Sequence, residues 1–145
     1  MEREIRIPGP CVNFKVAVLF RLMAERYQKA YTGLGLTNEQ VRMLLNLKGA
    51  GSINQRGLAE RLELEKSTFS RTLKGMIKKG FISAKGNPED GRQFILSLTQ
   101  KGENKVGKIY PAWKTIHEET HALFGQASIN ELDRMLRILK QPDLL

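Results

Sequence analysis

The chain has 145 residues, with 24 Lys and Arg against 15 Asp and Glu, so its formal net charge at pH 7 is +9. This length suits one domain with a single hydrophobic core, and the positive charge favours a polyanionic partner. No run approaches the roughly 18 apolar residues of a membrane-spanning helix, and the N-terminus lacks the apolar segment of a signal peptide. The single cysteine cannot form an internal disulfide. We therefore expect a cytoplasmic protein without a membrane partner.

Two helices are expected in the first third of the chain. Residues 12–31 carry apolar side chains at helical spacing, which predicts a helix about 30 Å long at 1.5 Å per residue. Such a helix is longer than a small domain needs to cover its own core. Thr37 and Gln40 form a capping box for the next helix, which we expect to bury Val41, Leu44 and Leu45.

Two short helices joined by a brief turn are predicted next. Asn54 is a good N-cap for a helix that runs to about Leu62, and a second helix follows from about Lys66 to Lys79, before Gly80. The apolar side chains of the second helix form one stripe, Phe69, Leu73, Met76 and Ile77. Its opposite face carries hydroxyls and cations, Ser67, Ser70, Arg71, Lys74 and Lys78. Such groups bond phosphates and base edges, so this face is a candidate DNA surface, and an ordinary solvated face is the alternative.

A hairpin is predicted after these helices. Residues 81–85 and 93–98 have the composition of strands, and the residues 86–92 between them supply turn chemistry. Arg92 at the mouth of the loop can enter a minor groove, and Asp90 can orient its guanidinium. A surface hairpin in which these two side chains pair only with each other is the alternative. Residues 56–92 carry a net charge of +4, the largest share in the chain. A helix-turn-helix followed by such a hairpin is the plan of a winged helix.

The last third of the chain predicts two more helices. Thr99 caps a long helix that is interrupted at Pro111, where the missing N–H should kink it. Ser128 and Glu131 form a second capping box for a last helix, whose apolar side is Leu132, Met135, Leu136 and Leu139. Like the first helix, these two helices have apolar faces without a partner in the winged core. We expect them to pack against their equivalents in a second subunit, and packing within one chain is the alternative.

Five segments, in order and at compatible spacing, resemble the multiple antibiotic resistance regulator (MarR) family of bacterial and archaeal transcription regulators. They are residues 58–62 (LAERL), 66–71 (KSTFSR), 79–82 (KGFI), 88–92 (PEDGR) and 98–102 (LTQKG). The resemblance covers nearly the whole chain and implies a mainly α-helical, dimeric protein with a small β-hairpin wing. It implies a single MarR-type domain over residues 1–145. Residues 37–102 would then form the winged helix-turn-helix lobe, and residues 12–36 and 103–145 the dimerisation helices.

The expected function is therefore transcription regulation, most simply repression, by a homodimer that binds a pseudo-palindromic site in double-stranded DNA. We expect major-groove contacts from Ser67, Thr68, Ser70, Arg71 and Lys74, backbone contacts from Gln55, Arg56, Lys66 and Lys78, and wing contacts from Asp90 and Arg92. A small-molecule effector between the dimerisation helices and the winged lobe would change the spacing of the two lobes. The alternative from another class is a winged-helix module that holds a protein partner.

Residues 117–121 (HEETH) match a metallopeptidase motif, in which two histidines one helical turn apart bind zinc and the glutamate acts as general base. No third ligand has a recognisable spacing, so we expect neither an enzyme nor a bound metal or cofactor. A zinc peptidase and an adventitious or regulatory metal site remain the alternatives.

Two further features suggest regulation. Cys11 directly precedes the first helix, and some MarR relatives sense hydroperoxides through a cysteine at that place; an unreactive cysteine is the alternative. Tyr27, Tyr31, Trp113 and His117 are candidates for an aromatic ligand pocket. Aromatic side chains at helical spacing belong more often to a hydrophobic core than to a pocket. A place in the core is therefore the alternative for these four residues.

Overall fold

The structure is a computed structural model, and it describes residues 9, 11–86, 89 and 93–144. Within these residues the chain forms six α-helices, a three-stranded antiparallel sheet and a short C-terminal 3-10 helix. In chain order the elements are α1 (Val12–Ala30), α2 (Asn38–Ala50), β1 (Ser52–Asn54), α3 (Gln55–Leu62), α4 (Lys66–Lys78), β2 (Ile82–Gly86), β3 (Phe94–Leu98), α5 (Gln100–Phe124), α6 (Gln126–Leu139) and the 3-10 helix Pro142–Leu144.

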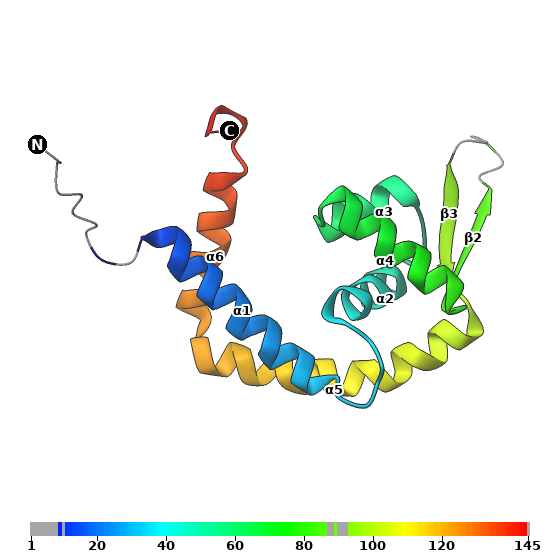
Figure 1. Cartoon of the computed structure of the whole chain (residues 1–145), viewed down its shortest axis with the longest axis horizontal. Helices are drawn as coiled ribbons and strands as arrows, with labels where there is room; N and C mark the ends of the chain where they lie inside the picture. Colours follow the sequence, from blue (N-terminus) through cyan, green and yellow to red (C-terminus); the bar gives the residue numbers. More distant parts are fainter. Residues whose placement is uncertain (1–8, 10, 87–88, 90–92, 145) are drawn as a thin grey trace, which may run out of the picture.

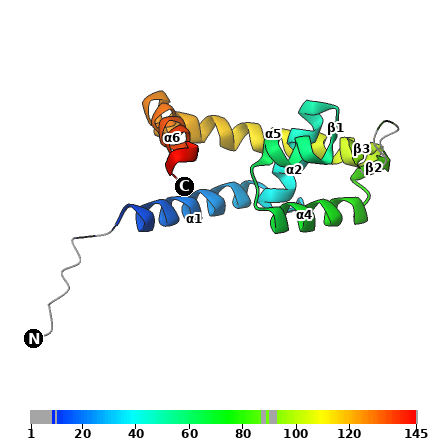
Figure 2. The same ribbon diagram turned by 90° about the horizontal axis from the view of Figure 1, so that it is seen from above.

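The elements form a winged lobe and an elongated helical arm. Helix α5 begins at the base of the β2–β3 hairpin and runs to the opposite end of the molecule, where α1 and α6 lie (Figure 1). Helix α2 lies between α5 and α4 in both views (Figures 1 and 2). It contacts α1, α3, α4 and α5 as well as β1 and β3, so it is the centre of the lobe.

The hydrophobic core sits around α2. Its side chains Val41, Met43, Leu44 and Leu47 are buried, while Leu45, which we expected to be buried, is only half-buried. By contrast, neither α1 nor α6 has a buried residue. Large apolar side chains of both helices, such as Phe14 and Leu139, therefore stay exposed, as the sequence pattern predicts. Tyr27 and Ala30 near the end of α1 nevertheless pack against the core. The same expectation for α5 is wrong, because α5 buries Val106 and Ile109 in the core of the lobe.

Three helix caps predicted from the sequence are confirmed. The Thr37 Oγ1 accepts from the Gln40 backbone N–H, and the Gln40 side chain accepts from the Thr37 N–H at 3.0 Å, which completes the capping box. The Asn54 Oδ1 accepts from the Gly57 N–H at 2.7 Å, and α3 begins at the next residue. The Thr99 Oγ1 accepts from the Gly102 N–H at 3.0 Å at the start of α5.

Two predictions for the C-terminal helices are wrong. The capping box at Ser128 does not form, because α6 already begins at Gln126, and its N-cap Gly125 has no side chain to make the bond. The left-handed backbone of Gly125 (φ 79°) ends α5 and starts α6 within one residue. The expected interruption at Pro111 also does not occur, since α5 continues through it to Phe124. A proline removes one backbone donor, and the other hydrogen bonds of a 25-residue helix maintain it.

The sheet contains a strand that the sequence did not predict. The strand order is β1-β3-β2, with Ile53 of β1 and Ala84 of β2 both opposite Leu96 of β3. Three residues are too few to show the alternation of a strand, so β1 carries no sequence signal of its own. The two wing strands are confirmed to within one residue at each end. Leu96 is fully buried, so the sheet is anchored to the core through its central strand.

Gly102 permits the close approach of α5 to the chain that leaves α4. A Cβ at this position would lie 2.1 Å from the carbonyl oxygen of Phe81. The Thr99 N–H donates to that same oxygen at 3.0 Å, so the carbonyl cannot move without losing a hydrogen bond.

We predict that Gly102→Ala destabilises the fold by about 1–3 kcal/mol, because the new methyl group collides with this backbone carbonyl. The matched control is Gly107→Ala in the same helix, where nothing lies within 4 Å of the added Cβ. This control should be neutral or stabilising by up to about 1 kcal/mol. Urea unfolding at one fixed protein concentration measures both, and equal midpoints for the two variants would contradict the predicted contact.

Candidate nucleic-acid interface and the adjoining cavity

Helix α4 is held in the lobe by one apolar stripe. Phe69, Leu73 and Met76 are buried, as predicted. Ile77 is 38% exposed and does not belong to the stripe, contrary to our expectation. At 3.6 residues per turn Ile77 lies about 80° around the helix from Phe69, at the edge of the buried arc. The helix therefore presents a broad outer face to solvent.

That outer face carries hydroxyl groups and free cations. Ser67, Arg71, Lys74 and Lys78 are exposed, whereas Thr68 and Ser70 are half-buried. Among the residues that the structure describes, no ion pair includes a cation of α4. Arg56 at the start of α3 differs, since its Nε lies 3.2 Å from the Glu60 carboxylate. The cations of α4 are therefore available to an anionic ligand without first breaking an ion pair.

The turn between α3 and α4 is fixed from two sides. Its first residue, Glu63, has a left-handed backbone (φ 49°). The preceding carbonyl, that of Leu62, accepts from the Arg42 Nη1 of α2 at 3.2 Å. On the other side, the Lys140 Nζ at the end of α6 lies 2.5 Å from the Glu63 carboxylate. The start of α4 therefore depends on contacts from α2 and α6.

The base of the wing is bonded to the end of α4. The Thr99 hydroxyl donates to the Gly80 carbonyl at 2.5 Å, and the Lys101 Nζ donates to the Lys79 carbonyl at 2.7 Å. These bonds hold the hairpin and α4 in one relative orientation. The predicted wing residues Asp90 and Arg92 lie outside the described residues.

A polar clasp joins α1 to the start of α2. The Gln28 side chain donates to the Leu36 carbonyl at 2.9 Å and accepts from the Asn38 N–H at 3.2 Å. The Asn38 Nδ2 in turn donates to the Ala24 carbonyl at 2.9 Å. The Gln28 side chain uses both of its polar groups, and Asn38 adds its Nδ2, while its buried Oδ1 has no partner among the described residues. These three bonds position the C-terminal half of α1 relative to α2.

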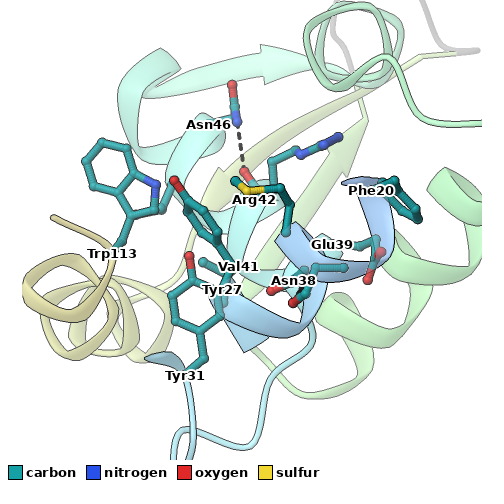
Figure 3. A pocket seen from close by; sticks show the side chains of 12 residues that line it. Phe20, Tyr27, Tyr31, Asn38, Glu39, Val41, Arg42, Asn46 and Trp113 are labelled. Atoms are coloured by element: carbon teal, nitrogen blue, oxygen red, sulfur yellow. Dashed lines mark hydrogen bonds between the residues drawn. The ribbon is translucent and has the colours of Figure 1, made fainter. Parts of the chain in front are cut away.

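A cavity of about 380 Å³ lies beside this clasp, between α1, α2 and α5. Figure 3 shows the rings of Tyr27, Tyr31 and Trp113 on one side and Phe20 and Glu39 on the other, with Arg42 between them. Three of the four aromatic residues predicted for a pocket therefore line this cavity. His117 does not line it, and instead stacks on Trp113 with 4.7 Å between ring centroids.

Sequence reasoning missed the polar residues that connect the cavity to the lobe, Gln28, Asn38 and Arg42. Each is a single polar side chain on an amphipathic helix, and such residues usually face solvent. No sequence pattern distinguishes them, because their partners are backbone carbonyls and amides that only the packing of the helices brings close.

The other candidate residues lie apart from this cavity. The rings of His117 and His121 are 4.3 Å apart on α5, but the described residues include no group of three His, Cys, Asp or Glu side chains that could hold a metal ion. Cys11 is exposed next to the first residue of α1. Within the described ranges, no helix has the length and apolarity needed to cross a bilayer.

The two-helix unit, the paired hairpin and the outer face of α4 define a winged helix-turn-helix protein. A sequence model of the MarR family matches residues 34–93. The Bacillus subtilis (strain 168) protein YdcH, an uncharacterized HTH-type transcriptional regulator, is 31% identical over 139 residues, which cover 90% of this chain and 91% of YdcH. The chain belongs to the MarR family of transcriptional regulators.

Solved structures agree with this fold. The Mycobacterium tuberculosis regulator MOSR, in complex with DNA, has a TM-score of 0.74 at 24% identity, and the match covers 91% of this chain and 100% of MOSR. BpsR of Bordetella bronchiseptica, whose DNA binding is regulated by 6-hydroxynicotinic acid, has a TM-score of 0.79 at 16% identity, with 95% and 99% covered. At these identities the likeness concerns the fold alone.

Tyr31 in the cavity wall has a perturbed acidity. Burial, and to a smaller extent the neighbouring Tyr27, raises the pKa of Tyr31 from 10.0 to about 12. In the unfolded chain this phenol ionises near pH 10, whereas in the folded protein it stays protonated up to about pH 12. Its contribution to stability is therefore complete below pH 10 and is lost as the pH rises from 10 to 12.

We predict that Tyr31→Phe makes the loss of stability between pH 10 and 12 shallower, because the variant has no phenol to ionise at that position. The measurement is the urea midpoint at several pH values in this window. Tyr110→Phe removes an exposed hydroxyl from α5 and should keep the slope of the unaltered protein. The same slope for Tyr31→Phe as for Tyr110→Phe would show that Tyr31 is not protected from ionisation.

Proposed function

We propose that this MarR-family protein binds a specific site in double-stranded DNA as a homodimer and represses transcription from it. The observation that carries the proposal is the outer face of α4, which presents exposed, unpaired cations above a buried apolar stripe. A protein of this class acts where the chromosome is, in the cytoplasm of a prokaryotic cell. The proposal gives His117, Glu118 and His121 no catalytic role.

We assign the predicted DNA contacts to different parts of the duplex. We assign the major groove to α4, through Ser67, Thr68, Ser70, Arg71 and Lys74. An exposed Arg can bond two acceptors of one guanine, so Arg71 is our first candidate for base recognition. Gln55, Arg56, Lys66 and Lys78 are assigned to phosphates beside the groove, and Asp90 and Arg92 to the wing.

We predict that Arg71→Ala weakens binding to the specific site by about 1–3 kcal/mol and relaxes the base preference, because a base contact is lost. Lys78→Ala should instead weaken binding to all sequences alike and lower the salt slope by about one, because a phosphate contact is lost. Gel shifts with the promoter region of its own operon and with a random duplex, at several salt concentrations, measure both effects.

The control for these variants is Lys108→Ala, which removes an exposed cation from α5, far from the outer face of α4. Its affinity and salt slope should stay close to those of the unaltered protein. Equal losses on the operon promoter and on random DNA for Arg71→Ala would refute its role in base recognition. No binding of the unaltered protein to any duplex at low salt would contradict the proposed function and favour a protein partner.

The exposed apolar side chains of the arm support the homodimer. Large side chains on α1 and α6 are 37–75% exposed, among them Phe14, Phe20, Leu136 and Leu139. A two-fold axis lets the same patch on two subunits cover itself. The two copies of α4 would then read half-sites about 34–36 Å apart, one turn of the duplex.

We predict that the double variant Leu136→Glu, Leu139→Glu dissociates into monomers and loses operator affinity, because it buries charge in the proposed dimer interface. The dimer dissociation constant should rise at least about 30-fold, as for two energetically important contacts. Sedimentation equilibrium measures it. Phe94→Glu, which changes an equally exposed apolar residue on β3, should stay dimeric. A double variant that remains dimeric would place the interface elsewhere.

The cavity between α1, α2 and α5 is the proposed site of a small-molecule effector. It is largely apolar and aromatic, with a few polar side chains at its edge, which is the usual make-up of a ligand site. The structurally similar BpsR, whose DNA binding responds to 6-hydroxynicotinic acid, supports regulation of this kind. Trp113 is the single tryptophan of the chain and lines the cavity, so its fluorescence reports occupancy directly.

A further inference from the structure

Arg42 belongs to the cavity and to the helix-turn-helix at the same time. Its side chain forms part of the cavity wall between the aromatic cluster and Phe20 (Figure 3). The Nη1 of the same guanidinium donates to the Leu62 carbonyl at the end of α3, at 3.2 Å. A molecule that fills the cavity therefore lies against the side chain that holds α3.

The Leu62 carbonyl is a sensitive point for such a contact. The last carbonyls of a helix have no partner within the helix, so they depend on an external donor, and a guanidinium is a strong one. Leu62 is followed by the left-handed Glu63, and α4 begins only four residues after Leu62. A shift of this helix end therefore passes through a short turn to the start of α4.

The parts of the cavity wall that belong to the core are less free to respond, and Phe20, which is exposed, forms no hydrogen bond to the described part of the winged lobe. Tyr31 and Val41 are buried in the core, and the clasp of Gln28 and Asn38 fixes α1 against the start of α2. Arg42 is exposed, and a long side chain on the surface changes its conformation easily. A molecule in the cavity therefore affects the end of α3 most easily by moving the Arg42 side chain.

We propose that Arg42 is the residue that couples the cavity to α4: a molecule in the cavity displaces its guanidinium from the Leu62 carbonyl, and the released end of α3 moves α4 out of its DNA-binding position. This proposal rests on the DNA-binding function and the effector cavity proposed above. In it Arg42 is a positioning residue, since it contacts neither DNA nor its bases.

The test fills the cavity covalently, so that no natural effector is needed. In a Cys11→Ser background, which removes the single cysteine, Ala24→Cys places a thiol in the cavity wall for reaction with N-phenylmaleimide. With Arg42 present, labelling should weaken binding to the operon promoter at least about tenfold, within the usual range of allosteric coupling. With Arg42→Gln the same label should weaken binding less than about threefold, and Arg42→Lys, which keeps a cationic donor, should lie between.

Arg61→Gln is the matched control. Arg61 also joins α3 to α2, through its Nη1 and the carbonyl of Asn46 at 3.5 Å; Asn46 lines the cavity, but the Arg61 side chain does not. This variant loses the same charge as Arg42→Gln and should keep the full effect of the label. An equal effect of the label with Arg42 and with Gln at position 42, or its loss in Arg61→Gln as well, would overturn the proposal.

Hydrogen exchange separates this proposal from the proposed function. The Glu63 N–H donates to the Ala59 carbonyl at 3.1 Å and reports on the end of α3 without any DNA. Labelling should speed exchange of this amide with Arg42 present and leave it unchanged in Arg42→Gln. If the unlabelled protein binds no duplex, the proposed function fails, and the exchange result still decides whether Arg42 couples the cavity to α3. Unchanged exchange on labelling with Arg42 present would refute the coupling.

Discussion

The burial of α2 is the constraint on which the rest of the structure depends. Met43, Leu44 and Leu47 are fully buried, and the same helix contacts α1, α3, α4 and α5. Helix α2 is therefore the common support against which α3, α4 and the sheet pack. Its remaining surface forms part of the cavity. One helix is therefore both the centre of the winged lobe and one wall of the proposed effector site.

The polar contacts divide the molecule into a rigid lobe and an arm that is attached more loosely. Thr99 and Lys101 bond the end of α4 directly to the base of the wing, so the DNA-facing elements form one unit. The arm is joined to the lobe by the Gln28–Asn38 clasp, by Val106 and Ile109 of α5 in the core, and by separate polar pairs. Among them are the Lys48–Glu103 contact at 2.6 Å and the exposed Lys140–Glu63 pair. Exposed pairs of this kind contribute about 0–1 kcal/mol each. These exposed pairs add little to the clasp and to the core packing that hold arm and lobe together.

This arrangement explains how a small regulator combines recognition with response. In the proposed homodimer, specific binding needs two copies of α4 at one spacing, and the arm that carries the proposed interface sets that spacing. The cavity lies where the arm meets the lobe, so a ligand there acts on the relation between the two. A ligand shifts this equilibrium only by the difference in its affinity for the two geometries. This difference in affinity arises at residues that line the cavity and also contact the lobe, as Arg42 does.

The sequence by itself determined the helices, the two wing strands, three helix caps and the class of protein, because these depend on neighbours within a few residues. The stripe of Phe69 and Leu73, the cap at Thr99 and the outer cations of α4 are all of this kind. Strand β1, the exposure of Ile77 and the start of α6 at Gln126 were decided by tertiary packing and by one glycine. The cavity, the Gln28–Asn38 clasp and the Arg42–Leu62 contact also appear only in the folded chain. Their partners are backbone groups 8 to 20 residues away, and no local pattern encodes such distances.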